Sequence, residues 1–86
     1  MAEGLEKQTH QVIENLQAVL QEAGSDLDFI VKTTIYVTDI KHFAEVNKIY
    51  GEYFSTHKPA RSTVEVSNLP KDAMIEIDAI AVRVDL

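Results

Sequence analysis

Apolar residues recur at helical spacing over residues 5–23, with Glu, Gln and Lys between them. Gly24 follows this segment, and glycine is typical of the first position after a helix because it adopts positive φ at little cost. The pattern predicts an amphipathic helix that ends before Gly24, with an apolar stripe formed by Val12, Ile13, Leu16, Val19, Leu20 and Ala23.

The next segment, DFIVKTTIYVTD, is rich in β-branched and aromatic residues, which is typical of a strand. Alternation divides its side chains between two faces. One face carries Phe29, Val31, Thr33, Ile35 and Val37, and the other carries Ile30, Lys32, Thr34, Tyr36 and Thr38.

A second helical pattern runs from Thr38 to Pro59, with Asp39 or Thr38 as its N-terminal cap. Proline ends the pattern and biases the preceding Lys58 away from helical geometry. The expected buried stripe, with Asn47 beside it, consists of Ile40, Phe43, Val46, Tyr50 and Phe54.

Two further strands are predicted at residues 62–66 and 74–84, joined by SNLPKDA. The order α-β-α-β-β predicts an α+β fold in one domain over residues 1–86. We expect a small, mainly antiparallel sheet with two helices on one face, and the last two strands paired as a hairpin.

Alternation also sorts the side chains of this hairpin. Val64 and Val66 are expected against the helices, together with Ile75, Ile77, Ala79 and Ala81. The opposite face then carries Arg61, Thr63 and Glu65 from one strand and Met74, Glu76 and Asp78 from the other, which places Thr63 near Glu76 or Asp78.

Two interpretations of that polar face remain open. It can be a solvated surface with charged cross-strand pairs, which is the commoner case. However, Ile80, Val82 and Val84 continue the same face with apolar side chains, and Ile30 and Tyr36 fall on the non-helix side of the first strand. A face that is polar at one end and apolar at the other favours an interface with a polar pocket, so we expect another subunit to cover it.

Composition narrows the possible functions. Fourteen acidic residues against eight basic ones give a formal charge of −6, which argues against nucleic acid as a partner. The chain has no cysteine and no paired-ligand histidine spacing, so no metal site is expected. The start of the chain lacks the apolar region of a signal peptide, and no apolar run is long enough to span a membrane, so a cytoplasmic protein is expected.

The run PARSTVEVSNLPKDAMIEIDAIAV resembles the C-terminal signature of the Rid family, the reactive intermediate deaminases also called the YjgF or enamine/imine deaminase family. Upstream, residues 8–54 are similar to that family's two helices and intervening strand. The resemblance extends from about Glu6 to Val84.

The resemblance implies a homotrimer with a chorismate-mutase-like fold and active-site clefts between subunits. Rid proteins hydrolyse small 2-imino or enamine acids, such as 2-iminobutanoate and 2-iminopropanoate, to 2-keto acids and ammonia without a cofactor. Carried over to this chain, Arg61 binds the substrate carboxylate, Glu76 positions or activates the attacking water, and Thr63 and Asn47 line the substrate site.

This chain departs from the family pattern at its start. Family members usually begin with a further segment, a strand hairpin and a loop, which supplies part of the cleft wall. Here the sequence begins almost at the first helix, which fits a truncation, a natural short form or an altered oligomer equally well. The alternative to an enzyme is therefore a non-catalytic regulatory or interaction module that keeps the Rid fold with an incomplete cleft. Ribonuclease activity, also described in the family, suits the acidic balance least.

Overall fold

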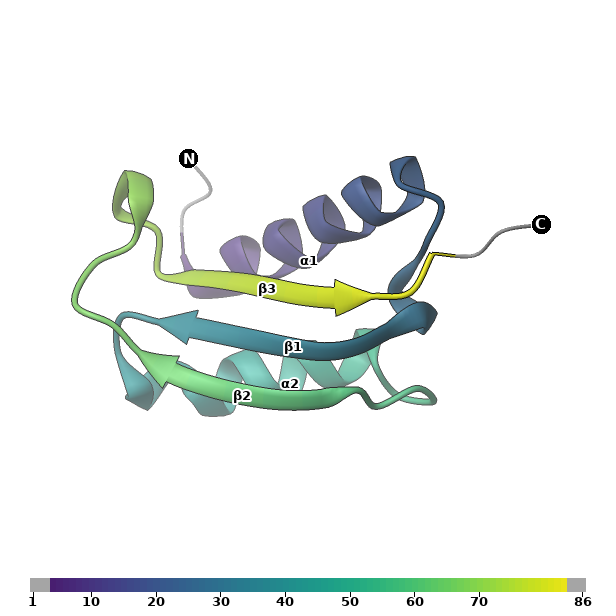
Figure 1. Cartoon of the computed structure of the whole chain (residues 1–86). Coiled ribbons are helices and arrows are strands. Elements are labelled where there is room, and N and C mark those ends of the chain that lie inside the picture. Colours follow the sequence, from purple (N-terminus) through teal and green to yellow (C-terminus); the bar gives the residue numbers. More distant parts are fainter. Residues whose placement is uncertain (1–3, 84–86) are drawn as a thin grey trace.

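The computed structural model describes residues 4–83 and confirms the predicted α-β-α-β-β order (Figure 1). Short 3₁₀ turns precede β1, α2 and β3. The main elements are α1 (Leu5–Glu22), β1 (Ile30–Val37), α2 (Phe43–Tyr53), β2 (Ala60–Glu65) and β3 (Ile75–Ala81).

The sheet is mixed, and its strand order is β2-β1-β3. β1 pairs with β2 in parallel and with β3 antiparallel, so the predicted hairpin of the last two strands is wrong. The reason is the connection between β1 and β2. A helical crossover allows β2 to lie parallel to β1 along one of its edges, and β3 takes the other edge of β1, so the outer edge of β2 stays unpaired within residues 4–83.

Both helices cover the same face of the sheet, as predicted. In Figure 1 they lie behind the strands, with α1 alongside β3 and α2 alongside β2. The core fills the layer between them, and every member of it is an aliphatic or aromatic side chain. Its fully buried members, each contributing roughly 1.5–3 kcal/mol by burial, include Ile13, Ile30, Ile35, Val37, Val46 and Ile75.

The element ends follow the local sequence. Gly24 has φ of 83° directly after α1, as expected of a helix C-terminus. The Asp39 side chain accepts a hydrogen bond from the backbone N–H of Lys41, 2.9 Å away, and caps the 3₁₀ turn before α2. Because α2 begins only at Phe43, Ile40 lies in this turn and is exposed, contrary to the predicted stripe, whereas Ile49 joins the core.

The faces of β1 differ from strict alternation at one end. The register with β3 shifts between Ile30 and Lys32, which marks a bulge. Ile30 is therefore fully buried against the helices, while Val31 and Phe29 are exposed. The predicted placement of these three side chains was wrong because a bulge reverses the alternation and the sequence carries no clear signal for one.

The faces of β2 are the reverse of the prediction. Arg61 and Thr63 pair with Thr33 and Ile35, which are buried under the helices, so both side chains lie on the helix side. Val64 pairs with Tyr36 on the open face of the sheet and is 42% exposed.

The faces of β3 are as predicted. Ile75, Ile77, Ala79 and Ala81 pack against the core, whereas Glu76, Asp78 and Ile80 lie on the open face. Val84, expected on the open face, lies outside the described residues. Within residues 4–83, no helix is long and apolar enough to cross a membrane.

The assignment of faces predicts contrasting costs for two aliphatic truncations. Ile35→Ala should lower the free energy of unfolding by about 2–5 kcal/mol, because it leaves a cavity in the core. Val64→Ala should lower it by less than about 1 kcal/mol, because that side chain is already half in solvent. Urea denaturation of both variants measures the difference. A loss at Val64 that equals the loss at Ile35 and does not depend on protein concentration would contradict the assignment.

Candidate active site

Arg61 lies on the edge strand β2 and extends over α2. Its Nη1 donates a hydrogen bond to Asn47 Oδ1 at 2.5 Å. Its guanidinium carbon lies 5.3 Å from the centroid of the Phe43 ring and 5.0 Å from that of the Tyr50 ring. Two aromatic rings and one amide therefore contact the same cation, and at this exposed position each cation–π contact contributes about 0.5–1 kcal/mol.

The Tyr50 ring is itself fixed. Its hydroxyl shares a buried hydrogen bond with Thr33 Oγ1 at 2.8 Å. Its ring stacks on Phe54 with centroids 4.5 Å apart. Because Tyr50 is anchored at both its ring and its hydroxyl, the cation above it rests on a rigid surface and has a defined orientation.

A cavity of about 460 Å³ opens beside Arg61. Aromatic rings form part of its wall, a glycine leaves room along α2, and two cations line it. None of its lining residues is acidic; these residues are Asn47, Tyr50, Gly51, Phe54, Lys58, Pro59 and Arg61. Such a site suits a small anion with an apolar body.

The structure brings together only some of the predicted site residues. Arg61 and Asn47 are in contact, and half-buried Thr63 shares their face two residues along β2. Glu76 does not join them, because it pairs with Tyr36 on the open face of the sheet. The expectation that Thr63 and Arg61 share a face with Glu76 is wrong. It followed from placing the apolar Val64 and Val66 against the helices, whereas Val64 pairs with Tyr36 on the open face.

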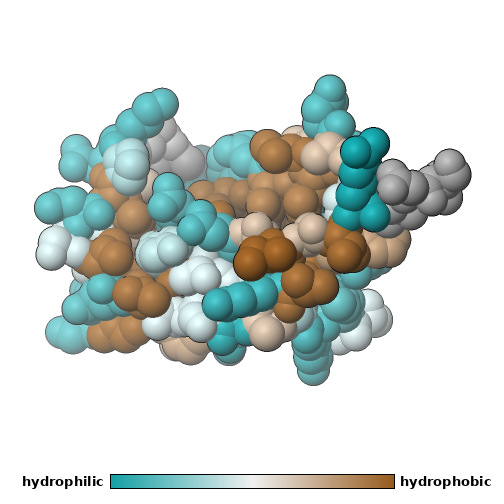
Figure 2. Space-filling model, in the orientation of Figure 1, coloured by the Kyte–Doolittle hydropathy of each residue, from teal (hydrophilic) through white to brown (hydrophobic). Residues whose placement is uncertain are grey.

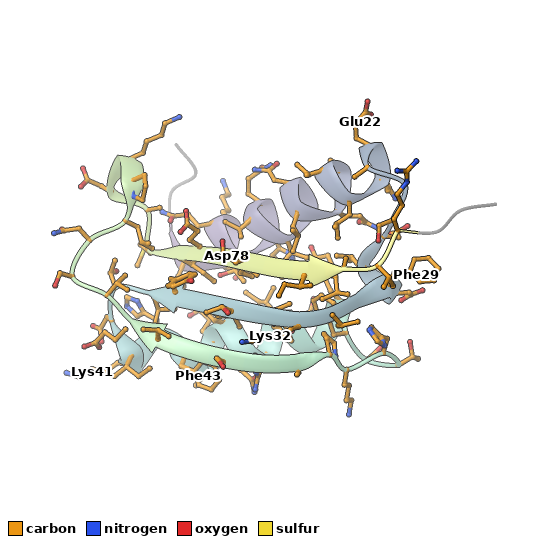
Figure 3. The ribbon with its side chains drawn as sticks, viewed as in Figure 1. Glu22, Phe29, Lys32, Lys41, Phe43 and Asp78 are labelled. Atoms are coloured by element: carbon orange, nitrogen blue, oxygen red, sulfur yellow. The ribbon has the colours of Figure 1, made fainter. Side chains whose placement is uncertain are left out.

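The open face around Glu76 has its own polar cluster. Tyr36 Oη donates a hydrogen bond to Asp78 Oδ2 at 3.0 Å. The pKa of Tyr36 is raised above its usual value. The main cause is this hydrogen bond to Asp78, and smaller contributions come from the charge of Asp78, slight burial and the charge of Glu76. Figure 3 shows Asp78 and Lys32 on this side of the sheet, away from the helices.

Apolar side chains adjoin this polar cluster. Ile80 is 62% exposed and pairs with Lys32, and Val64 lies on the same face. Figure 2 shows the resulting mixture of apolar and polar surface across the sheet, with the larger apolar area towards the end of β3. Apolar surface of this kind on a sheet is typical of an interface.

Three residues at the Arg61 site were missed as site residues by sequence reasoning. Phe43 and Tyr50 were interpreted only as part of a buried stripe, and Lys58 only as the residue before proline. Their role depends on α2 lying beside β2, a tertiary arrangement. The available signal was the spacing of Phe43 and Tyr50, four residues before and three residues after Asn47, which places all three on one face of the helix.

Comparisons with known proteins agree with the architecture. A family model described as Endoribonuclease L-PSP matches residues 1–83. A RutC family protein of Pyrococcus abyssi is 52% identical over 92% of this chain and 62% of its own length. The crystal structure of the conserved Rid family protein YyfA from Yersinia pestis has a TM-score of 0.90 at 54% identity, over 94% of this chain and 65% of that one.

One further relative has a structure with a bound ligand. The crystal structure of E. coli TdcF with bound serine has a TM-score of 0.91 at 38% identity, over 98% of this chain and 68% of that one. The chain thus spans about two thirds of the length of these relatives.

The Tyr36–Asp78 bond predicts a titration. Asp78→Asn should lower the pKa of Tyr36 towards its usual value, because the mutation removes the charge that opposes the phenolate. Ultraviolet absorbance of the phenolate against pH measures this shift. Asp72→Asn, in the exposed turn before β3, is the matched control and should leave the Tyr36 titration unchanged. An unchanged pKa in Asp78→Asn would show that the hydrogen bond does not form in solution.

Proposed function

This chain belongs to the Rid family of reactive intermediate deaminases, and we propose that it hydrolyses small 2-imino acids to 2-keto acids and ammonia. The substrates we propose are 2-iminobutanoate and 2-iminopropanoate, which carry a carboxylate beside the imine carbon. In this proposal the protein acts in the cytoplasm and uses no cofactor.

The main observation behind the proposal is that the guanidinium of Arg61 is held in place beside a cavity. Its Nη1 is engaged by Asn47, and its carbon lies against two aromatic rings at the wall of a cavity without acidic lining residues. Nε and Nη2 keep N–H donors for a planar carboxylate. Asn47 then acts as a positioning residue for Arg61, rather than as the direct substrate contact expected from the sequence.

The relative with bound serine supports this class of ligand. Serine is a small molecule with a carboxylate and a nitrogen on the adjacent carbon, and TdcF shares the fold of this chain at a TM-score of 0.91. A 2-imino acid has the same carboxylate and the same carbon–nitrogen connection.

The chemistry needs a water molecule and a base. Water adds through its oxygen to the imine carbon, the C=N π electrons move to nitrogen, and one proton passes from the water to that nitrogen. The resulting carbinolamine then breaks its C–N bond while its hydroxyl proton passes to nitrogen, which releases ammonia and leaves the keto group. Glu76 is the candidate carboxylate to accept and return the proton, a general acid–base role.

The positions of Arg61 and Glu76 determine how such a site can be built. In one copy of the chain they lie on opposite faces of the sheet, so they cannot hold the same substrate. We propose a homotrimer in which the Arg61 cavity of one copy meets the Glu76 face of another. The exposed apolar side chains beside Glu76, including Ile80, support burial of this face.

Two other functions are less well supported. A non-catalytic module that keeps the fold remains the alternative, because Arg61 and Glu76 do not meet within one copy of the chain. The family description names an endoribonuclease, but the formal charge is −6 and the cationic cavity beside Arg61 is small. We do not propose RNA as a substrate.

Replacement of Arg61 tests the carboxylate contact. Arg61→Ala should lower kcat/KM for 2-iminobutanoate by roughly 100-fold or more, because charge-assisted hydrogen bonds worth a few kcal/mol are lost. The imine is generated in situ by threonine dehydratase, and its decay is followed with and without the protein.

Lys48→Ala is the matched control, since Lys48 is an exposed cation on α2 that does not line the cavity. Circular dichroism should show that all variants are folded. Full activity in Arg61→Ala would remove Arg61 from the mechanism. A folded wild-type oligomer that does not accelerate imine decay would favour the non-catalytic module.

Mixing two inactive variants tests the shared site. Arg61→Ala and Glu76→Gln should each be nearly inactive alone. After unfolding and joint refolding, about a quarter of sites should combine an intact Arg61 with an intact Glu76 by random assortment. Activity should therefore return in the mixture. Native mass spectrometry confirms that mixed oligomers have formed, and mixed oligomers without activity would contradict a site built from two copies.

A further inference from the structure

Lys58 is a second cation on the wall of the Arg61 cavity. The two residues are three positions apart, so their backbones lie at most about 11 Å from each other. None of the residues that line the cavity is acidic, although the chain as a whole carries a formal charge of −6. The wall of the cavity is therefore positively charged in a chain whose net charge is negative, and it presents two positive groups to one ligand.

The backbone around Lys58 is held on both sides. On one side His57 Nε2 lies 2.6 Å from the backbone oxygen of Ile30. A carbonyl can only accept, so Nε2 carries the proton and donates it. On the other side Pro59 has a fixed φ and restricts Lys58 to extended geometry. Lys58 is thus presented by an anchored segment and not by a free loop.

His57 bonds to the residue at which the bulge in β1 begins. The register of β1 with β3 shifts between Ile30 and Lys32, and Ile30 itself is fully buried. The bulge therefore supplies the carbonyl that fixes the segment before Lys58. The position of the second cation is tied to the core of the sheet.

The volume of the cavity exceeds what the smallest imino acids need. A cavity of about 460 Å³ is in the size range that takes drug-sized ligands. A three- or four-carbon imino acid bound to Arg61 leaves much of this space, and Lys58, unused. A longer ligand with an anionic group at its far end would contact both cations.

We propose that the cavity selects 2-imino dicarboxylates, the imines of amino acids with a carboxylate on the side chain. Arg61 binds the carboxylate next to the imine carbon, and Lys58 binds the side-chain carboxylate. This inference rests on the proposed function and specifies its substrate class. The reaction is the same hydrolysis, in which water adds to the imine carbon and ammonia leaves, so the second carboxylate is recognised but not transformed.

A binding experiment tests the second cation without requiring turnover. The probes are 2-oxoglutarate and 2-oxopentanoate, keto acids of equal chain length that differ by the terminal carboxylate. Calorimetry at low salt should show about tenfold tighter binding of 2-oxoglutarate, and the preference should shrink as salt is added.

Substitutions assign that preference to Lys58. Lys58→Met keeps an unbranched side chain one atom shorter and removes the charge, so it should abolish most of the tenfold difference. Lys58→Arg should retain it. Lys48→Met, an exposed cation on α2 outside the cavity, is the matched control and should bind both probes as the wild type does. Equal binding of the two keto acids by the wild type, or an unchanged preference in Lys58→Met, would overturn the proposal.

A kinetic experiment separates this proposal from the deaminase function itself. An amino acid oxidase generates the imines of glutamate and norvaline in situ, and semicarbazide traps the imine that remains. The ratio of kcat/KM for the dicarboxylic imine to that for the monocarboxylic one should fall about tenfold in Lys58→Met and stay constant in Lys48→Met.

The binding and kinetic experiments together distinguish failure of the dicarboxylate proposal from failure of the deaminase proposal. Hydrolysis of both imines with a ratio that Lys58→Met does not change would overturn the dicarboxylate proposal and leave the deaminase intact. A preference for 2-oxoglutarate without hydrolysis of either imine would support the second anion contact and overturn the deaminase. A parallel loss of affinity for both keto acids in Lys58→Met would assign Lys58 a structural role and overturn its role in selectivity.

Discussion

The parallel pairing of β1 with β2 is the constraint on which the rest of the structure depends. Because the chain passes from β1 (Ile30–Val37) to β2 (Ala60–Glu65) through α2, the two strands run in the same direction and the helix covers the face they share. β3 is left with the other edge of β1. This arrangement decides which side chains of β2 turn towards α2, and therefore where its one arginine lies.

The environment of Arg61 is a direct product of that crossover. An edge strand does not need an apolar residue at every position on the helix side, so a long cation can extend over the flank of α2 and place its guanidinium against aromatic rings. One of these rings, Tyr50, belongs to the core, and its hydroxyl shares a hydrogen bond with Thr33 on the helix side of the sheet. The orientation of the binding group thus depends on the packing that stabilises the fold, so a change at Tyr50 would affect both.

Much of the fold could be predicted from the sequence because its signals are local. Helical periodicity, the glycine after α1 and the β-branched run of β1 each act within a few residues. The pairing of strands is not local, and the error there carried over to the site. Arg61 and Glu76 do lie on two strands, but their common face was inferred by placing Val64 and Val66 against the helices, and the edge strand β2 instead turns Arg61 and Thr63 to that side. The bulge at Ile30 is also non-local, because it arises only when β1 pairs with β3. It places Phe29, Ile30 and Val31 on the faces opposite to those predicted.

The opposed positions of Arg61 and Glu76 give the proposed homotrimer a chemical meaning. A single copy of the chain has a cationic cavity on one side of its sheet and a carboxylate beside exposed apolar surface on the other. Each half lacks what the other provides. If hydrolysis needs both, then burial of the apolar face and completion of the site are the same event. The hydrophobic contribution to association would also bring a base to the anion that Arg61 holds. Catalysis would then depend on the oligomer, because only the oligomer places the two groups at one substrate.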